Sequence, residues 1–153
     1  MQHTPPHTAT RLLAAVFLTA LCALCANAQF RQVVTYRTVS SDNHIIAASA
    51  FTFDSVDEPP RFPGGDGELL KFINRERRYP RAAYERKIQG RVLLSFIVDQ
   101  QGNIANPEIL RSVDDDLDTE ALRILAEMPR WTPGRIADIP VPVYCILAIP
   151  FRL

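Results

Sequence analysis

The sequence predicts an α+β fold: a two-layer sandwich in which a small three-stranded antiparallel sheet carries helices on one face. Residues 91–99 alternate between two faces, one of them wholly apolar, which is typical of a strand that covers a core. Residues 117–128 instead repeat apolar side chains at helical spacing. A chain of 153 residues has room for one domain of ordinary size and a tail.

The first 28 residues have the three parts of a secretory signal peptide. Arg11 precedes an uncharged, mostly apolar run from Leu12 to Ala26, and Ala26-Asn27-Ala28 supplies the cleavage site. We expect cleavage after Ala28 and export of the remaining chain. The alternative is an uncleaved inner-membrane anchor, for which about 15 apolar residues are short, because a membrane span needs roughly 20.

Residues 29–60 show no sustained period and are expected to form an extended leader or linker. Short runs of β-type composition are interrupted by the polar segment 40–43. Prolines and glycines then crowd residues 57–67, which favours a loop. We therefore expect the domain itself to cover residues 61–153.

Two short helices are expected at the start of the domain. The first begins at Asp66, a residue type that caps helices, and has apolar side chains at helical spacing over residues 69–73. It ends before Tyr79, because the residue before a proline avoids the helical region. Pro80 is suited to open the second helix, which Gly90 ends.

A hairpin is expected next. The strand over 91–99 is followed by turn-forming residues at 100–103, and residues 104–113 return as the second arm. Pro107 lies within that arm and has no N–H to donate. This favours an edge strand or a bulge at that point.

The last helix and the last strand complete the expected order. Acidic residues at 114–116 suit the positive end of a helix dipole and precede the helix over 117–128. Residues 141–152 alternate two sets of side chains and predict a final strand.

The charge balance excludes one class of partner. The chain has 17 basic and 17 acidic side chains and a formal net charge of zero, so we expect no nucleic-acid partner. The charges are nevertheless segregated, with a basic stretch at 71–91 and an acidic one at 108–120. These stretches are either solvated faces or a docking surface.

Catalytic and metal sites are not expected. After cleavage the chain keeps one histidine, His44, and one cysteine, Cys145. His44 lies in the irregular leader, and Cys145 lies on an apolar strand face, where a thiol usually acts as a small core residue. Without a credible nucleophile and base, we expect a protein that is not an enzyme and uses no cofactor or metal.

The expected domain carries an ordered set of motifs. They include Tyr79-Pro80, Ile88-Gln89-Gly90-Arg91-Val92, Gly102-Asn103-Ile104, Met128-Pro129-Arg130-Trp131-Thr132-Pro133-Gly134 and Phe151-Arg152-Leu153. Together these motifs resemble the C-terminal domain of TonB proteins, especially those of Bacteroidetes-type bacteria. The resemblance covers about 90 residues, and the combination is more specific than any single motif.

The resemblance implies a periplasmic energy-transduction adaptor. Such proteins connect an inner-membrane proton-channel motor complex to TonB-dependent outer-membrane receptors, which import iron chelates, cobalamin or glycans. They hold a receptor segment, the TonB box, by adding it as a strand beside their final strand. The implied partner-binding residues are Tyr79, Pro80, Val143, Tyr144, Cys145, Ile146, Leu147, Ala148 and Ile149.

Two features leave an alternative open. Glu76-Arg77-Arg78 stands where well-known members have a polar, glutamine-containing approach to Tyr79-Pro80. Residues 29–60 reach at most about 110 Å when fully extended. The alternative is an unanchored periplasmic interaction module that binds a strand or a cell-wall component without transducing force. The sequence leaves open whether the domain pairs with a second copy by strand exchange.

Overall fold

The structure is a computed structural model that describes residues 32–39 and 45–153. These residues belong to one compact unit, Gln32–Leu153. The expected signal peptide at 1–28 and His44 lie outside the described residues. No helix in the described ranges is long and apolar enough to cross a membrane.

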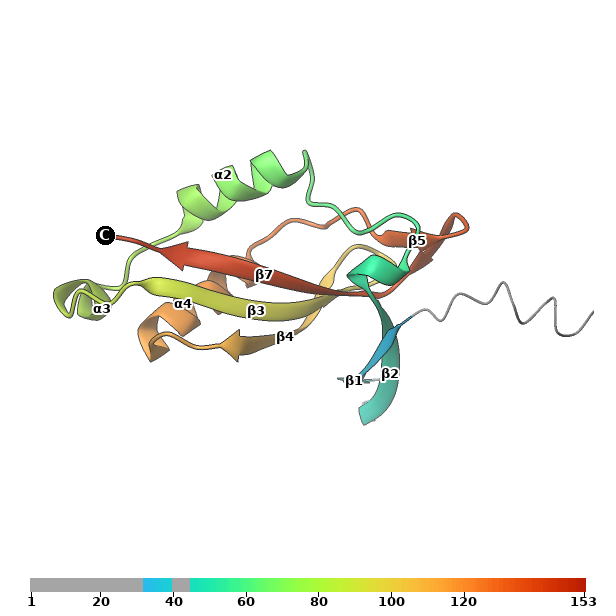
Figure 1. Cartoon of the computed structure of the whole chain (residues 1–153), viewed down its shortest axis with the longest axis horizontal. Coiled ribbons are helices and arrows are strands. Elements are labelled where there is room, and N and C mark those ends of the chain that lie inside the picture. Colours follow the sequence, from blue (N-terminus) through green and yellow to red (C-terminus); the bar gives the residue numbers. More distant parts are fainter. Residues whose placement is uncertain (1–31, 40–44) are drawn as a thin grey trace, which may run out of the picture. The chain divides into compact units, whose positions relative to one another are not determined.

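Two sheets and three α-helices make up the described part of the chain (Figure 1). One sheet has the strand order β1-β2-β7-β3-β4, and the other pairs β5 with β6. In chain order the elements are β1 (Val33–Val39), β2 (Ile45–Thr52), the 3-10 turn η1 (Phe53–Ser55), α2 (Asp66–Glu76), α3 (Arg81–Glu85), β3 (Gly90–Val98), β4 (Ile104–Arg111), α4 (Asp115–Ala126), β5 (Gly134–Ile136), β6 (Ile139–Val141) and β7 (Val143–Phe151).

The main sheet has five strands, so the expectation of three was wrong, although the α+β class is correct. The two additional strands, β1 and β2, come from the segment expected to be a leader. They pair antiparallel with each other, and Phe51 and Thr52 of β2 then pair parallel with Val143 and Tyr144 of β7. This pairing joins residues about 90 positions apart in the chain, and local periodicity carries no information about such partners.

The helices cover one face of the sheet, as expected. On that face every second residue of β3 is buried and meets apolar side chains of β7, α2 and α4 in a single core. The largest fully buried side chains of this core are Phe96, Phe151, Ile73, Leu94, Leu117, Ile124, Leu125, Ile149, Val92, Val98 and Val143.

Helix starts and strand irregularities follow the local chemistry. Gly65, with a φ of 82°, is the residue before α2, so Asp66 lies in the first turn of the helix and not at its cap. Asp114 caps α4 by accepting a hydrogen bond from the N–H of Asp116. In β4 the register shifts around Pro107, beside Asn106 with a φ of 49°, which confirms the expected bulge.

The short β5–β6 hairpin was not expected. Ala137 and Asp138 both have positive φ angles, 48° and 66°, which is the backbone of a tight type I′ turn. Neither is a glycine or asparagine, so the usual sequence signal for this turn is missing.

The basic and acidic stretches partly neutralise each other. Arg86 at the end of α3 forms ion pairs with Asp114 at 2.8 Å and with Asp116 at 2.9 Å. The hydrogen bonds from Arg86 to Asp114 raise the pKa of its guanidinium. Part of the charge segregation therefore fixes α3 against the start of α4.

Candidate docking edge

The last strand, β7, is paired along its whole length on only one side. Its partner there is β3, which runs antiparallel from Gly90↔Phe151 to Val98↔Val143. On its other side, β2 pairs only with Val143 and Tyr144. Beyond these two residues, no described strand pairs with that side of β7, and we call this stretch the open edge (Figure 1).

Two carbonyl groups show which residues of β7 direct their main chain toward the open edge. The carbonyl oxygen of Pro142 accepts a hydrogen bond of 2.9 Å from the N–H of Phe51 in β2. The carbonyl oxygen of Pro150 accepts one from Nη1 of Arg77. Main-chain groups alternate along a strand, so residues of the same parity between these two prolines also face that edge. They are Tyr144, Ile146 and Ala148.

Both ends of the open edge are closed. At the start, β2 occupies the positions beside Val143 and Tyr144 and continues into η1. At the end, Pro150 has no N–H, and Arg77 occupies its carbonyl group. The N–H and C=O groups of Ile146 and Ala148 are left between these ends. In the sequence, Arg77 is notable only as part of a departure from the family pattern. Nothing in the sequence predicts its hydrogen bond to the carbonyl group of Pro150.

The structure divides the predicted β7 residues into two groups. Val143, Cys145 and Ile149 are buried on the helix side, and Leu147 on the same side is half-buried. Their main-chain groups face β3. Of the outward-facing group, Tyr144 is half-buried and Ala148 is exposed, and the side chain of Ile146 is 57% exposed on the face without helices.

Tyr79 and Pro80 lie at the far end of β7. The Tyr79 hydroxyl donates a hydrogen bond to the Ile88 carbonyl, and its ring meets Phe151 edge-on at 6.0 Å. Pro80 precedes α3 with a φ of −61°, which suits the start of a helix. Both residues are half-buried, so each supports the fold and still offers some surface at this end of the strand.

Cys145 should behave as a core residue. Burial raises the pKa of its thiol to about 12, and only 4% of the residue is exposed. We expect a thiol reagent at about pH 8 to leave Cys145 unmodified in the folded chain and to modify it after denaturation, because the thiolate is the reactive form. Peptide mapping by mass spectrometry distinguishes this thiol from Cys22 and Cys25. Modification at equal rates in both states would contradict the core placement.

No group of three or more His, Cys, Asp or Glu side chains able to hold a metal occurs among the described residues. The open edge itself carries main-chain groups and apolar side chains. Its chemistry is therefore that of hydrogen-bonded strand pairing.

The fold and this edge define an α+β domain with one incompletely paired strand. The family model for the C-terminal region of the Gram-negative bacterial TonB protein matches residues 75–153. The chain belongs to this family. The matched range contains α3, α4, β3 and β7, but not β1 or β2.

Solved structures of the same family are similar. An NMR solution structure of the Helicobacter pylori TonB C-terminal domain is 26% identical; the match covers 60% of this chain and 86% of that one, with a TM-score of 0.44. A shorter NMR structure of that domain is 23% identical, covers 54% of this chain and 88% of its own, and gives a TM-score of 0.39. The comparison with curated proteins gave no match.

Proposed function

We propose that this protein is a TonB-type adaptor that docks on TonB-dependent outer-membrane receptors by strand addition and supports the import of a nutrient such as an iron chelate, cobalamin or a glycan. The observation that carries the proposal is the open edge of β7 at Ile146 and Ala148. The family assignment supports the same conclusion. The receptor's TonB box would extend the sheet beside β7.

The size of the open edge sets the strength of docking. Two residues offer four main-chain hydrogen bonds, each worth about 1 kcal/mol net. About 4 kcal/mol corresponds to a dissociation constant of roughly 1 mM. Tighter binding requires side-chain contacts, which the exposed Ile146 supplies at the centre and which Tyr79 and Pro80 supply where a longer partner passes the end of β7.

Ile146→Pro tests strand addition directly. The N–H of Ile146 faces the open edge, so a proline removes a bond to the partner and none to β3. We expect a labelled TonB-box peptide to lose measurable binding in a fluorescence-anisotropy titration. Ile146→Ala, which keeps the N–H, should weaken binding only severalfold.

Thermal unfolding checks that the variants fold. Ala148→Pro is a second variant of the same kind, because the N–H of Ala148 also faces the open edge. Peptide binding unchanged in both folded proline variants would contradict docking at this edge. Absence of peptide binding to the unmodified chain would contradict the proposal as a whole.

The proposal includes export to the periplasm and a connection to the inner-membrane proton-channel motor complex. These depend on residues 1–28, which lie outside the described part. We expect mass spectrometry of the mature protein to find an N-terminus at Gln29. A chain that starts there would rule out a self-anchored transducer and would require another subunit to supply the link to the motor. A retained N-terminus would contradict cleavage.

A further inference from the structure

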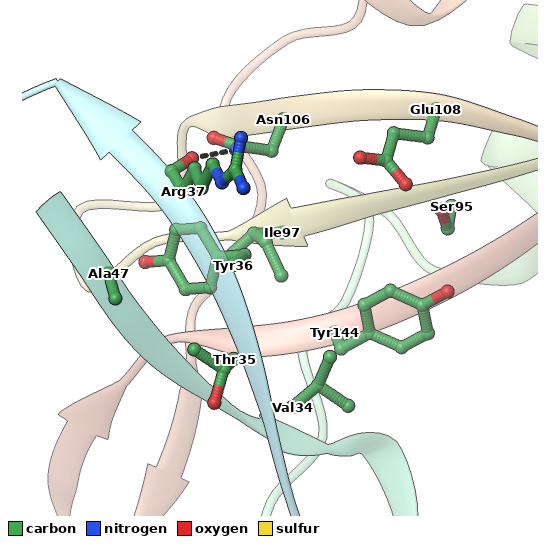
Figure 2. A pocket seen from close by; sticks show the side chains of 10 residues that line it. All are labelled: Val34, Thr35, Tyr36, Arg37, Ala47, Ser95, Ile97, Asn106, Glu108 and Tyr144. Atoms are coloured by element: carbon green, nitrogen blue, oxygen red, sulfur yellow. Dashed lines mark hydrogen bonds between the residues drawn. The ribbon is translucent and has the colours of Figure 1, made fainter. Parts of the chain in front are cut away.

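A groove of about 520 Å³ lies on the face of the sheet that the helices leave uncovered (Figure 2). The β1–β2 hairpin forms one wall, and β3, β4 and β7 form the rest. Its volume is within the range of small-molecule sites, roughly 300–1,000 Å³. The hairpin precedes the residues that the family model matches, so this wall is additional to the matched domain.

Asn106 holds the hairpin over the groove. Its positive φ, within the bulge of β4, places its side-chain amide against β1, where it donates a hydrogen bond to the carbonyl of Arg37 (Figure 2). The bond uses the main chain of Arg37 and leaves its guanidinium free to line the groove. The amide oxygen of Asn106 remains available as an acceptor.

Two opposite charges line the groove without meeting. Arg37 comes from β1 and Glu108 from β4, and neither forms an ion pair with any side chain in ranges 32–39 and 45–153. The main chain of Arg37 is held by Asn106, and Glu108 lies two residues further along β4. A ligand that carries both an ammonium and a carboxylate group can therefore pair with both side chains at once.

Neutral hydrogen-bonding groups lie on the same groove. Ser95 is 1% exposed, yet its hydroxyl forms no hydrogen bond within the described part of the chain and lines the groove. Burial, and secondarily the charge of Asp99, raises the pKa of Tyr36, so its hydroxyl keeps its proton at neutral pH. Both hydroxyl groups can therefore hydrogen-bond to a ligand in the groove.

We propose that this groove binds a short zwitterionic peptide, with its carboxylate on Arg37, its ammonium group on Glu108 and its amide bonded to Ser95. Charge-assisted hydrogen bonds at both ends would supply most of the affinity. This site is separate from strand docking, because it uses side chains on the face of the sheet and not the main chain at the edge of β7.

The test is an NMR titration of the ¹⁵N-labelled full chain with alanyl-alanine. We expect the amide signals of Ser95, Ile97 and Asn106 to shift. The N-acetylated dipeptide lacks the ammonium group, and the C-amidated dipeptide lacks the carboxylate. Each should bind about tenfold more weakly or worse.

Charge variants connect each peptide end with its residue. Glu108→Gln should reduce the affinity for alanyl-alanine but not for its N-acetylated form, which has no ammonium group to lose. Arg37→Gln should reduce the affinity for alanyl-alanine but not for its C-amidated form, which has no carboxylate to lose. Neither change removes the main-chain bond to Asn106. No shift at about 10 mM peptide, equal binding of the doubly blocked peptide, or shifts confined to other elements would each overturn the proposal.

Discussion

Gly102→Ala is expected to destabilise the domain by more than about 3 kcal/mol. Gly102 has a φ of 83°, where a side chain is strained, and an added Cβ would lie 1.9 Å from the carbonyl oxygen of Trp131. The two backbones cannot separate freely, because the Trp131 N–H donates a 2.8 Å hydrogen bond to the Gly102 carbonyl. Equilibrium denaturation with urea measures the loss.

Gly65→Ala is the matched control. Gly65 has almost the same φ, 82°, but an added Cβ meets nothing within 4 Å. Its variant should show the backbone strain alone, about 1–3 kcal/mol. A loss at Gly102 no larger than the loss at Gly65 would contradict the steric account of the contact with Trp131.

Replacing Arg123 with leucine is expected to destabilise the domain by about 2–3 kcal/mol. Arg123 forms ion pairs with Glu120 at 2.7 Å and Glu127 at 2.6 Å, and it also donates to the carbonyl of Glu76 at 2.6 Å. Glu120 is 8% exposed, so loss of Arg123 leaves a buried carboxylate without its main partner. Thermal and urea denaturation both measure this change.

The control for Arg123 is Arg81→Ala. Arg81 forms an ion pair of 2.8 Å with Glu85, but both side chains are largely exposed. Solvent screening makes such pairs weak, so this variant should be nearly as stable as the parent chain. Equal losses in the two variants would show that burial of Glu120 does not decide the effect.

Glu120 also makes the stability of the domain depend on pH. Burial alone would raise the pKa of its carboxyl, but hydrogen bonds from Arg123 and the Arg78 N–H, with their charges, outweigh burial and leave the pKa below its ordinary value of 4.5. A lowered folded-state pKa means that the stabilisation is present above the unfolded pKa and is lost as the pH falls through the folded one. Glu120→Gln should therefore flatten the loss of stability below about pH 4.5. If the free energy of unfolding of the variant fell below about pH 4.5 as steeply as that of the parent chain, Glu120 would not be the source of this pH dependence.

The sequence predicted the elements whose signals are local. Alternation identified β3 and β7, helical spacing identified α2 and α4, and Pro107 identified the bulge of β4. It did not predict that β2 would pair with β7, because that contact depends on residues far apart in the chain and on only two residue pairs. The β5–β6 turn was missed because Ala137 and Asp138 do not have the usual turn composition.

The candidate edge was predicted from the family resemblance, but its usable part required the structure. Alternation along β7 identifies two faces and does not say which main-chain groups already have partners. The bonds at Pro142 and Pro150 decide that, and they reduce a predicted stretch of seven residues to the groups of Ile146 and Ala148. The hydrogen bond from Arg77 to Pro150 forms because the end of α2 lies beside the end of β7, and local sequence patterns do not predict that position.

Amide hydrogen exchange of β7, measured by NMR with and without a TonB-box peptide, tests strand addition most directly. The account predicts that the peptide slows exchange at the amides of Ile146 and Ala148. The amides of Leu147 and Ile149 already bond to β3 and should change little. Equal protection of all four residues, or protection confined to another strand, would contradict docking at the open edge.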